Sequence, residues 1–129
     1  MASTVRIIKH GPKEYTIEVD ETSLTTSSEA TIDLPAELQL FRLYSYISRL
    51  RSGAAATIQP TLGRVTNPTN AEDIELQATA GAGPFTEYLS PPLRMMANGA
   101  LKLYHRAKPN TGSDNSVLTR YRVRAGWEG

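Results

Sequence analysis

Hydrophobic and polar residues alternate along most of the 129-residue chain, and short polar turns separate the alternating runs. A period of two is typical of strands that bury one face and expose the other. The runs and their turn signals predict an all-β fold, a single antiparallel β-sandwich over residues 1–129 with about eight short strands; a jelly roll is one form that such a sandwich takes. Residues 1–9 are predicted to be either the first strand or an extended arm that pairs with a neighbouring molecule.

The clearest alternation lies between residues 99 and 127. Two runs, 101–106 and 117–124, flank the turn-rich segment 108–115, which predicts an antiparallel hairpin. In the second run one face carries Val117, Thr119, Tyr121 and Val123, and the other carries Leu118, Arg120, Arg122 and Arg124. Arginine forks suit bidentate contacts with carboxylates, so Arg120, Arg122 and Arg124 are candidate partner-binding residues.

Residues 38–51 fit two patterns. Helical spacing is found at Leu40, Leu43, Tyr44, Ile47 and Leu50. Strand-like alternation is also found, with Leu40, Tyr44 and Tyr46 on one side and Phe41, Leu43 and Ile47 on the other. We favour a strand because the flanking runs are all β-like, although periodicity alone does not decide between the two.

Charge is distributed unevenly although the net charge is only +1, which argues against a general nucleic-acid-binding protein. Residues 13–37 hold seven acidic side chains and one base, whereas residues 98–129 hold six bases and two acids. Two explanations are open. The two segments pair within one subunit, or they are complementary surfaces on neighbouring molecules.

Residue types that carry catalysis are sparse. The chain has no cysteine, and its two histidines, His10 and His105, are not spaced to seat a metal on one element. The Gly81–Gly83 pair lacks the context of a phosphate-binding loop. We therefore expect no enzyme activity, no cofactor and no metal. The N-terminus has no apolar signal-peptide core and no run is long enough to span a membrane, so we expect synthesis in a cytoplasm and no membrane partner.

Aromatic side chains leave two questions open. Tyr44, Tyr46, Tyr104 and Tyr121 lie on predicted strands, where they would either form a stacking platform for sugars or fill the core. Trp127, near the end of the chain, either folds back to close the sandwich or docks on another subunit.

Two segments taken together, Ser52–Arg64 and Asp114–Glu128, with the strand exit Asp33-Leu34-Pro35, resemble small β-sandwich virion proteins of tailed bacteriophages. The resemblance implies a non-enzymatic, self-associating protein of the capsid decoration or cement type, which sits on the capsid surface of the virion. It implies a homotrimer that binds the major capsid protein. The family supplies no active-site residues.

The sequence therefore predicts a structural protein that decorates or cements the phage head. A neck or tail component and a carbohydrate-binding module are the alternatives. The candidate interface residues are Arg120, Arg122, Arg124, Trp127, Val5 and Ile7.

Overall fold

The computed structural model describes residues 2–24, 29–65, 74–76, 79–80, 86–110 and 114–127. Within these ranges the chain forms ten strands and one short 3-10 helix, Ala36–Leu38. The strands are β1 (Ala2–Lys9), β2 (Glu14–Leu24), β3 (Ala30–Asp33), β4 (Leu40–Ser52), β5 (Thr57–Gly63), β6 (Ile74–Glu75), β7 (Thr79–Ala80), β8 (Glu87–Met96), β9 (Lys102–Pro109) and β10 (Asn115–Ala125). The predicted loop at 81–84 lies outside the described residues.

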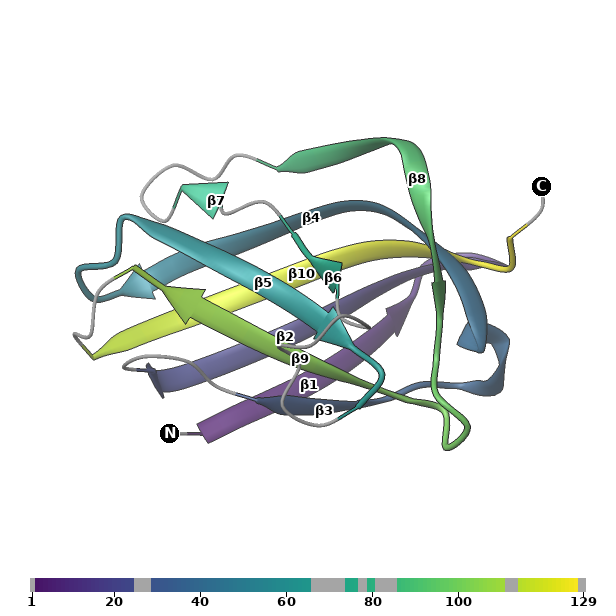
Figure 1. Ribbon diagram of the computed structural model, residues 1–129, viewed down its shortest axis with the longest axis horizontal. Coiled ribbons are helices and arrows are strands. Elements are labelled where there is room, and N and C mark those ends of the chain that lie inside the picture. Colours follow the sequence, from purple (N-terminus) through teal and green to yellow (C-terminus); the bar gives the residue numbers. More distant parts are fainter. Residues whose placement is uncertain are drawn as a thin grey trace.

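The strands form two antiparallel sheets that stack face to face, as predicted (Figure 1). One sheet has the order β1-β2-β10-β4-β8, and the other has the order β3-β9-β5-β6, with β7 also paired to β5. After β2, every connection crosses from one sheet to the other except those that join β5, β6 and β7. Such crossing is typical of double-sheet jelly rolls.

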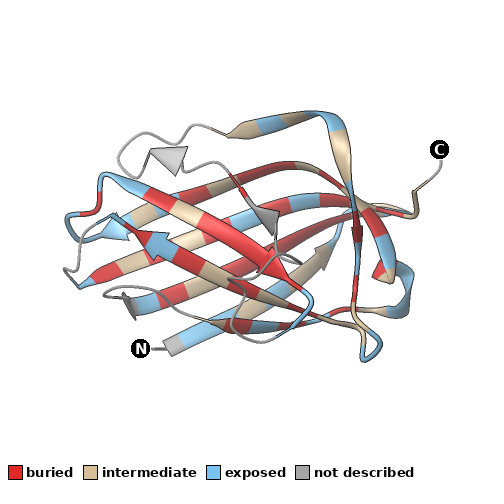
Figure 2. Cartoon of the chain, in the orientation of Figure 1, coloured by how far each residue is buried: buried red, intermediate tan, exposed pale blue. Residues whose placement is uncertain are grey.

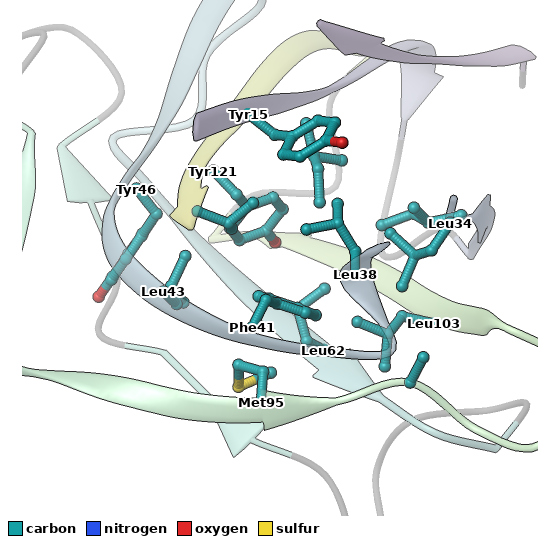
Figure 3. Close-up of a cluster of buried hydrophobic side chains, with 14 of the residues drawn as sticks. Tyr15, Leu34, Leu38, Phe41, Leu43, Tyr46, Leu62, Met95, Leu103 and Tyr121 are labelled. Carbon is teal, nitrogen blue, oxygen red and sulfur yellow. The ribbon is translucent and has the colours of Figure 1, made fainter. Parts of the chain in front are cut away.

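Burial alternates along the strands, and Figure 2 shows this as alternating colours. In β10 the residues Val117, Thr119, Tyr121 and Val123 are buried, as the sequence predicted. The main core cluster combines side chains of both sheets and of the 3-10 helix, whose Leu38 is fully buried (Figure 3). Burying apolar surface between the sheets is the main stabilising contribution to such a fold.

The predicted hairpin over residues 99–127 is wrong. β9 pairs with β3 and β5, whereas β10 pairs with β2 and β4 in the other sheet. Alternation along a strand fixes which side chains point inward, but it does not identify the neighbouring strand. Both strands bury one face, and these faces meet across the sandwich, where the rings of His105 and Tyr121 make an edge contact with centroids 5.7 Å apart.

The ambiguous segment is a strand, as favoured, but its tyrosines do not share a face. Arg122 pairs with Ser45 and the next residue, Val123, pairs with Leu43, so Tyr44 is the extra residue of a β-bulge. The bulge shifts the alternation by one. Tyr46 is therefore buried in the core with 2% of its surface exposed, whereas Tyr44 lies half-buried on the outer face.

Pro91 and Pro92 lie inside β8, although prolines ordinarily interrupt a strand. β8 is an edge strand, and edge strands tolerate proline because one side of the backbone has no ladder partner. The ladder with β4 is nevertheless interrupted there, since Leu43 pairs with Leu93 while Ser45 pairs with Tyr88. The prolines thus interrupt the pairing and not the strand.

Candidate partner-binding surface

The outer face of the β1-β2-β10-β4-β8 sheet carries most of the arginines of the chain and three open cavities. The largest, of about 660 Å³, is lined by residues of β1, β2, β4 and β10. The other two have volumes of about 440 and 410 Å³ and extend the hollowed surface toward Thr86 and Tyr88. This face is where the sequence placed its three candidate arginines.

Strand pairing places the outward side chains in rows that run across the sheet. One row is Ile8, Thr16, Arg122, Ser45 and Tyr88, and the next is Arg6, Glu18, Arg120 and Ile47. Residues directly opposite each other on one face of an antiparallel pair have Cβ atoms about 5 Å apart. Each row is therefore a set of neighbouring side chains contributed by distant parts of the sequence.

The carboxylates of this face come from β2 and are paired with arginines of the same chain. Glu18, with a buried side chain, accepts from Arg120 Nε at 2.6 Å and lies 3.4 Å from Arg6. Glu14 lies 3.2 Å from Arg124. Of the two explanations for the uneven charge, pairing within one subunit is thus confirmed for these residues. Lys102, which pairs with Asp33 in the other sheet, follows the same pattern.

The arginines of β4 and β8 find few carboxylates on their own two strands, although Arg51 of β4 pairs with Asp20 of β2. The only acidic residue of these two strands is Glu87, which pairs in the ladder with the inward-facing Tyr46. Arg49 on β4 and Arg122 on the adjacent β10 form no ion pair with any residue that the structure describes. The β4–β8 side of the face therefore carries an excess of positive charge.

Three arginines are directly opposite one another across β10, β4 and β8. Arg124 pairs with Arg42, and Arg42 pairs with Arg94. We call these residues the arginine row. Like charges directly opposite in a sheet repel each other, and here the ion pair of Arg124 with Glu14 offsets part of the repulsion. Nε of Arg124 is also buried without a hydrogen-bond partner among the described residues.

Apolar side chains flank the arginine row on both sides. Four large hydrophobic residues are exposed among those described: Leu40, Val65, Tyr88 and Met96. Three of them lie on β4 and β8, where Leu40 pairs with Met96 on one side of the row. On the other side, Tyr88 is 80% exposed and lines the 410 Å³ cavity together with Tyr44. We call Leu40, Arg42, Tyr44, Tyr88, Arg94 and Met96 the β4–β8 patch.

The β-bulge of β4 contributes to this patch directly. Because it inserts one residue, Tyr44 and Ser45 both face outward, and Ser45 forms a buried floor beneath the cavity. The guanidinium of Arg42 lies 5.6 Å from the centre of the Tyr44 ring, a distance at which a cation–π contact orients both groups. Bulges commonly redirect side chains at binding sites.

Trp127 folds back onto its own chain. Its indole Nε1 donates to the backbone oxygen of Met95 at 2.9 Å, and Arg94 lies 5.8 Å from its ring. It lines a cavity of about 230 Å³ with apolar residues of both sheets, including Leu62 and Leu103. Of the two arrangements that the sequence left open, the structure therefore has the one in which Trp127 folds back onto its own sandwich.

Val5 and Ile7, the other two predicted interface residues, lie on β1. Both are half-buried and pack against the main core cluster. β1 pairs with β2 of the same chain over its full length, so one edge of it is already occupied. The opposite edge of β1 has no strand partner among the described residues, and pairing with a neighbouring molecule stays a prediction for that edge.

The four tyrosines proposed as a stacking platform do not form one. Tyr46 and Tyr121 are buried in the core, with 2% and 1% of their surface exposed. Tyr44 and Tyr104 are half-buried but belong to different sheets. The sequence analysis missed Tyr88, the most exposed aromatic side chain among those described. Pro91 and Pro92, on the same strand, are a sequence signal that this strand lies at a sheet edge.

A buried polar network joins the two sheets. His105 Nε2 lies 3.1 Å from a carboxylate oxygen of Glu21, and Nδ1 lies 2.7 Å from the Tyr121 hydroxyl. Glu21 and His105 are fully buried, and burial raises the pKa of Tyr121 well above its usual value. His105 is thus a satisfied core histidine. Glu21 continues the inward face of Ile17 and Val19 on β2, so alternation along this strand places its carboxyl group in the core.

Among the described residues, no cluster of three or more potential ligands is placed to hold a metal ion. No helix in the same ranges has the length and apolar character needed to cross a membrane. His10 is bonded to a neighbour, since its Nε2 lies 2.7 Å from the Thr16 hydroxyl at the edge of the 440 Å³ cavity.

Comparison with known proteins assigns no family. No protein-family model matches the sequence, and no curated protein matches it. Among solved structures, the chain is similar to the CBM22-1 xylan-binding domain of Xyn10C from Paenibacillus barcinonensis. The alignment covers 98% of this chain and 83% of that domain at 11% sequence identity, with a TM-score of 0.46.

Proposed function

We propose that this chain is a non-enzymatic binding protein that docks the β4–β8 patch onto an acidic surface of another protein. The observation that carries the proposal is the coincidence of three exposed hydrophobic residues on β4 and β8 with a row of three arginines across β10, β4 and β8. Arginine, tyrosine and methionine are enriched at protein interfaces, and exposed apolar groups of this kind mark interaction sites.

The partner that we propose is the major capsid protein of a tailed bacteriophage, so that the chain decorates or cements the head. The resemblance of Ser52–Arg64 and Asp114–Glu128 to virion proteins motivates this choice. A rigid sandwich with one positively charged face would hold adjacent capsid subunits together through their carboxylates. Arg49 and Arg122 are available for such contacts because no described residue pairs with them.

The test measures binding of the purified protein to phage heads assembled without it, by co-sedimentation. Replacing Tyr88 and Met96 together by serine removes apolar contacts from the patch while leaving the core intact. We expect binding to weaken by about tenfold or more, the loss typical of residues that dominate an interface. Val65→Ser is the matched control, because Val65 is the exposed hydrophobic residue outside β4 and β8.

Heads that bind the protein should also resist heating better than bare heads. Absence of binding, or equal binding by the double variant and the wild type, would refute docking through the patch.

The cavity lined by Tyr44 and Tyr88 also favours a second candidate, a carbohydrate-binding module. A glycan that binds the wild type, fails to bind Tyr88→Ala and competes with no protein partner would transfer the assignment to that class.

A further inference from the structure

We infer that the cavity of about 440 Å³ on the outer face binds a sugar that carries a carboxylate, as one unit of an acidic oligosaccharide. The inference goes beyond the proposed function, because its occupant is a saccharide and no residue of the β4–β8 patch lines this cavity. It starts from Arg49 and Arg122, which line the cavity and form no ion pair within the described residues.

The positive charge of the cavity comes from these two arginines. A third arginine that lines it, Arg120, is already compensated, since its Nε donates to Glu18 at 2.6 Å. The side chains of the described residues that line the cavity include no carboxylate. Arg49 and Arg122 are both exposed, and guanidinium groups match the planar geometry of a carboxylate. A ligand that binds here would therefore supply the negative charge.

Hydroxyl groups form part of the cavity wall. Ser45 is only 3% exposed, and its hydroxyl forms no hydrogen bond with the residues that the structure describes. Thr16 is also buried, and its hydroxyl lies 2.7 Å from Nε2 of His10. A serine hydroxyl both donates and accepts hydrogen bonds, as sugar hydroxyls do, whereas an inorganic anion only accepts them. The free hydroxyl of Ser45 thus favours a ligand that carries hydroxyl groups.

The remaining walls suit a sugar ring better than a nucleobase. Ile47 and Leu118 line the cavity and are half-buried, so they offer apolar surface to the C–H groups of a ring. Ligand sites of about 300 to 1,000 Å³ commonly combine such apolar walls with a few polar groups. Tyr46 also lines the cavity but is 2% exposed, so it presents no ring face for base stacking.

The positions of the two arginines favour an extended ligand. On β10, Arg122 is opposite Ser45 of β4. Arg49 lies four residues further along β4, which is about 13 Å in a strand. At Ser45 and Arg122 the cavity also adjoins the cavity of about 410 Å³, because both residues line the two. An oligosaccharide that lies along the strands would contact both arginines and have space for more than one ring.

The experiment compares a galacturonic acid trimer with its methyl ester, which has the same rings and hydroxyls but no charge. Each is titrated into the full-length protein, and amide chemical shifts from heteronuclear NMR give the dissociation constant and map the site. We expect the acid to bind at least about tenfold more tightly than the ester, with shifts at Ser45 and Arg122. This preference should weaken as salt screens the charges. Inorganic phosphate, as a third probe, should bind more weakly than the trimer.

The variants separate the charge from the hydroxyl. Arg122→Gln should weaken binding of the acid by about tenfold and leave the ester within about twofold, because only the acid loses a charged hydrogen bond. Arg64→Gln is the matched control: Arg64 is also exposed and without an ion pair among the described residues, but it follows β5 of the facing sheet. Ser45→Ala should weaken both saccharides by about threefold, because its hydroxyl contact does not depend on their charge.

Four results would overturn the inference. They are no binding of the trimer, equal affinity for the acid and the ester, equal effects of Arg122→Gln and Arg64→Gln, and tighter binding of phosphate than of the trimer. If phage heads bind through the β4–β8 patch while the trimer does not bind, the sugar site fails and the proposed function stands. If the trimer binds in the expected way while heads do not, the proposed function fails and the sugar site stands.

Discussion

Tyr121 carries its hydroxyl into the core because His105 lies opposite it in the facing sheet. The two ring nitrogens of His105 thus contact Glu21 through Nε2 and the Tyr121 hydroxyl through Nδ1. These three buried polar groups are tolerated because each has a partner. Removing one of them leaves a buried group unsatisfied.

We predict that Tyr121→Phe destabilises the protein by about 1 to 3 kcal/mol at neutral pH, the usual cost of leaving a buried polar group without its partner. Urea unfolding measures the change. Tyr104→Phe is the control, because Tyr104 is half-buried on the outer face of its sheet, and we expect its effect to stay within about 0.5 kcal/mol.

The stability of the wild type and that of Tyr121→Phe should also differ at alkaline pH. Burial raises the pKa of Tyr121 well above its value of 10.0 in the unfolded chain. The stabilisation linked to this group is therefore complete below pH 10 and is lost as the pH rises toward the folded pKa. Stability of the wild type should fall more steeply above pH 10 than that of Tyr121→Phe. Parallel pH profiles would contradict this account of the network.

At the level of elements, alternation predicted which faces are buried more reliably than which strands are neighbours. The inward residues of β10 were predicted correctly. The predicted β9–β10 hairpin was wrong because apolar and polar residues alternate with the same period of two in paired strands and in strands of facing sheets. Which strands pair depends on the topology of the whole fold, and a local pattern of residues does not specify it.

The candidate surface was predictable only in part for the same reason. Arg120, Arg122 and Arg124 were placed correctly on one outer face of a strand. Arg42 and Arg94 could not be added to them, because their alignment with Arg124 requires the order β10-β4-β8. The bulge at Tyr44 left a signal, since the alternation of apolar residues slips by one between Leu43 and Tyr46.

The turn between β4 and β5 depends on Gly53. Its φ is +121°, and a Cβ atom there would lie 2.3 Å from Oδ1 of Asn115. That oxygen accepts from the backbone amides of Ala54 and Ala55, each at 3.2 Å. A side chain at position 53 would thus strain the backbone and displace the acceptor that holds the turn.

We predict that Gly53→Ala destabilises the protein by about 2 to 3 kcal/mol, because it combines a positive φ with a clash against backbone atoms. Thermal unfolding followed by circular dichroism measures the loss. Gly99→Ala is the matched control, since no atom lies within 4 Å of its added Cβ and its φ is not positive. A similar loss for both variants would show that the clash at Gly53 is relieved at little cost.

For the whole molecule, the resemblance to decoration proteins predicts a homotrimer. One subunit has a mass of 14.1 kDa, so light scattering on the purified chain should report about three times that value. We expect Tyr88→Ser/Met96→Ser to leave this mass unchanged, because the patch is proposed to face the capsid. A stable monomer would contradict the trimer in solution, and a monomeric double variant would place the patch between subunits.

The position of β10 in the sheet has a consequence for biosynthesis. β10 is the central strand of the β1-β2-β10-β4-β8 sheet, yet it comes last in sequence among the strands that the structure describes, and Arg120 meets Glu18 across 102 residues of sequence. Until residues 115–125 leave the ribosome, β2 and β4 have no strand between them. Pairing over such distances is slow and leaves strand edges exposed. The nascent chain must therefore wait for β10, and truncation before Asn115 would leave the edges of β2 and β4 open and prone to aggregation.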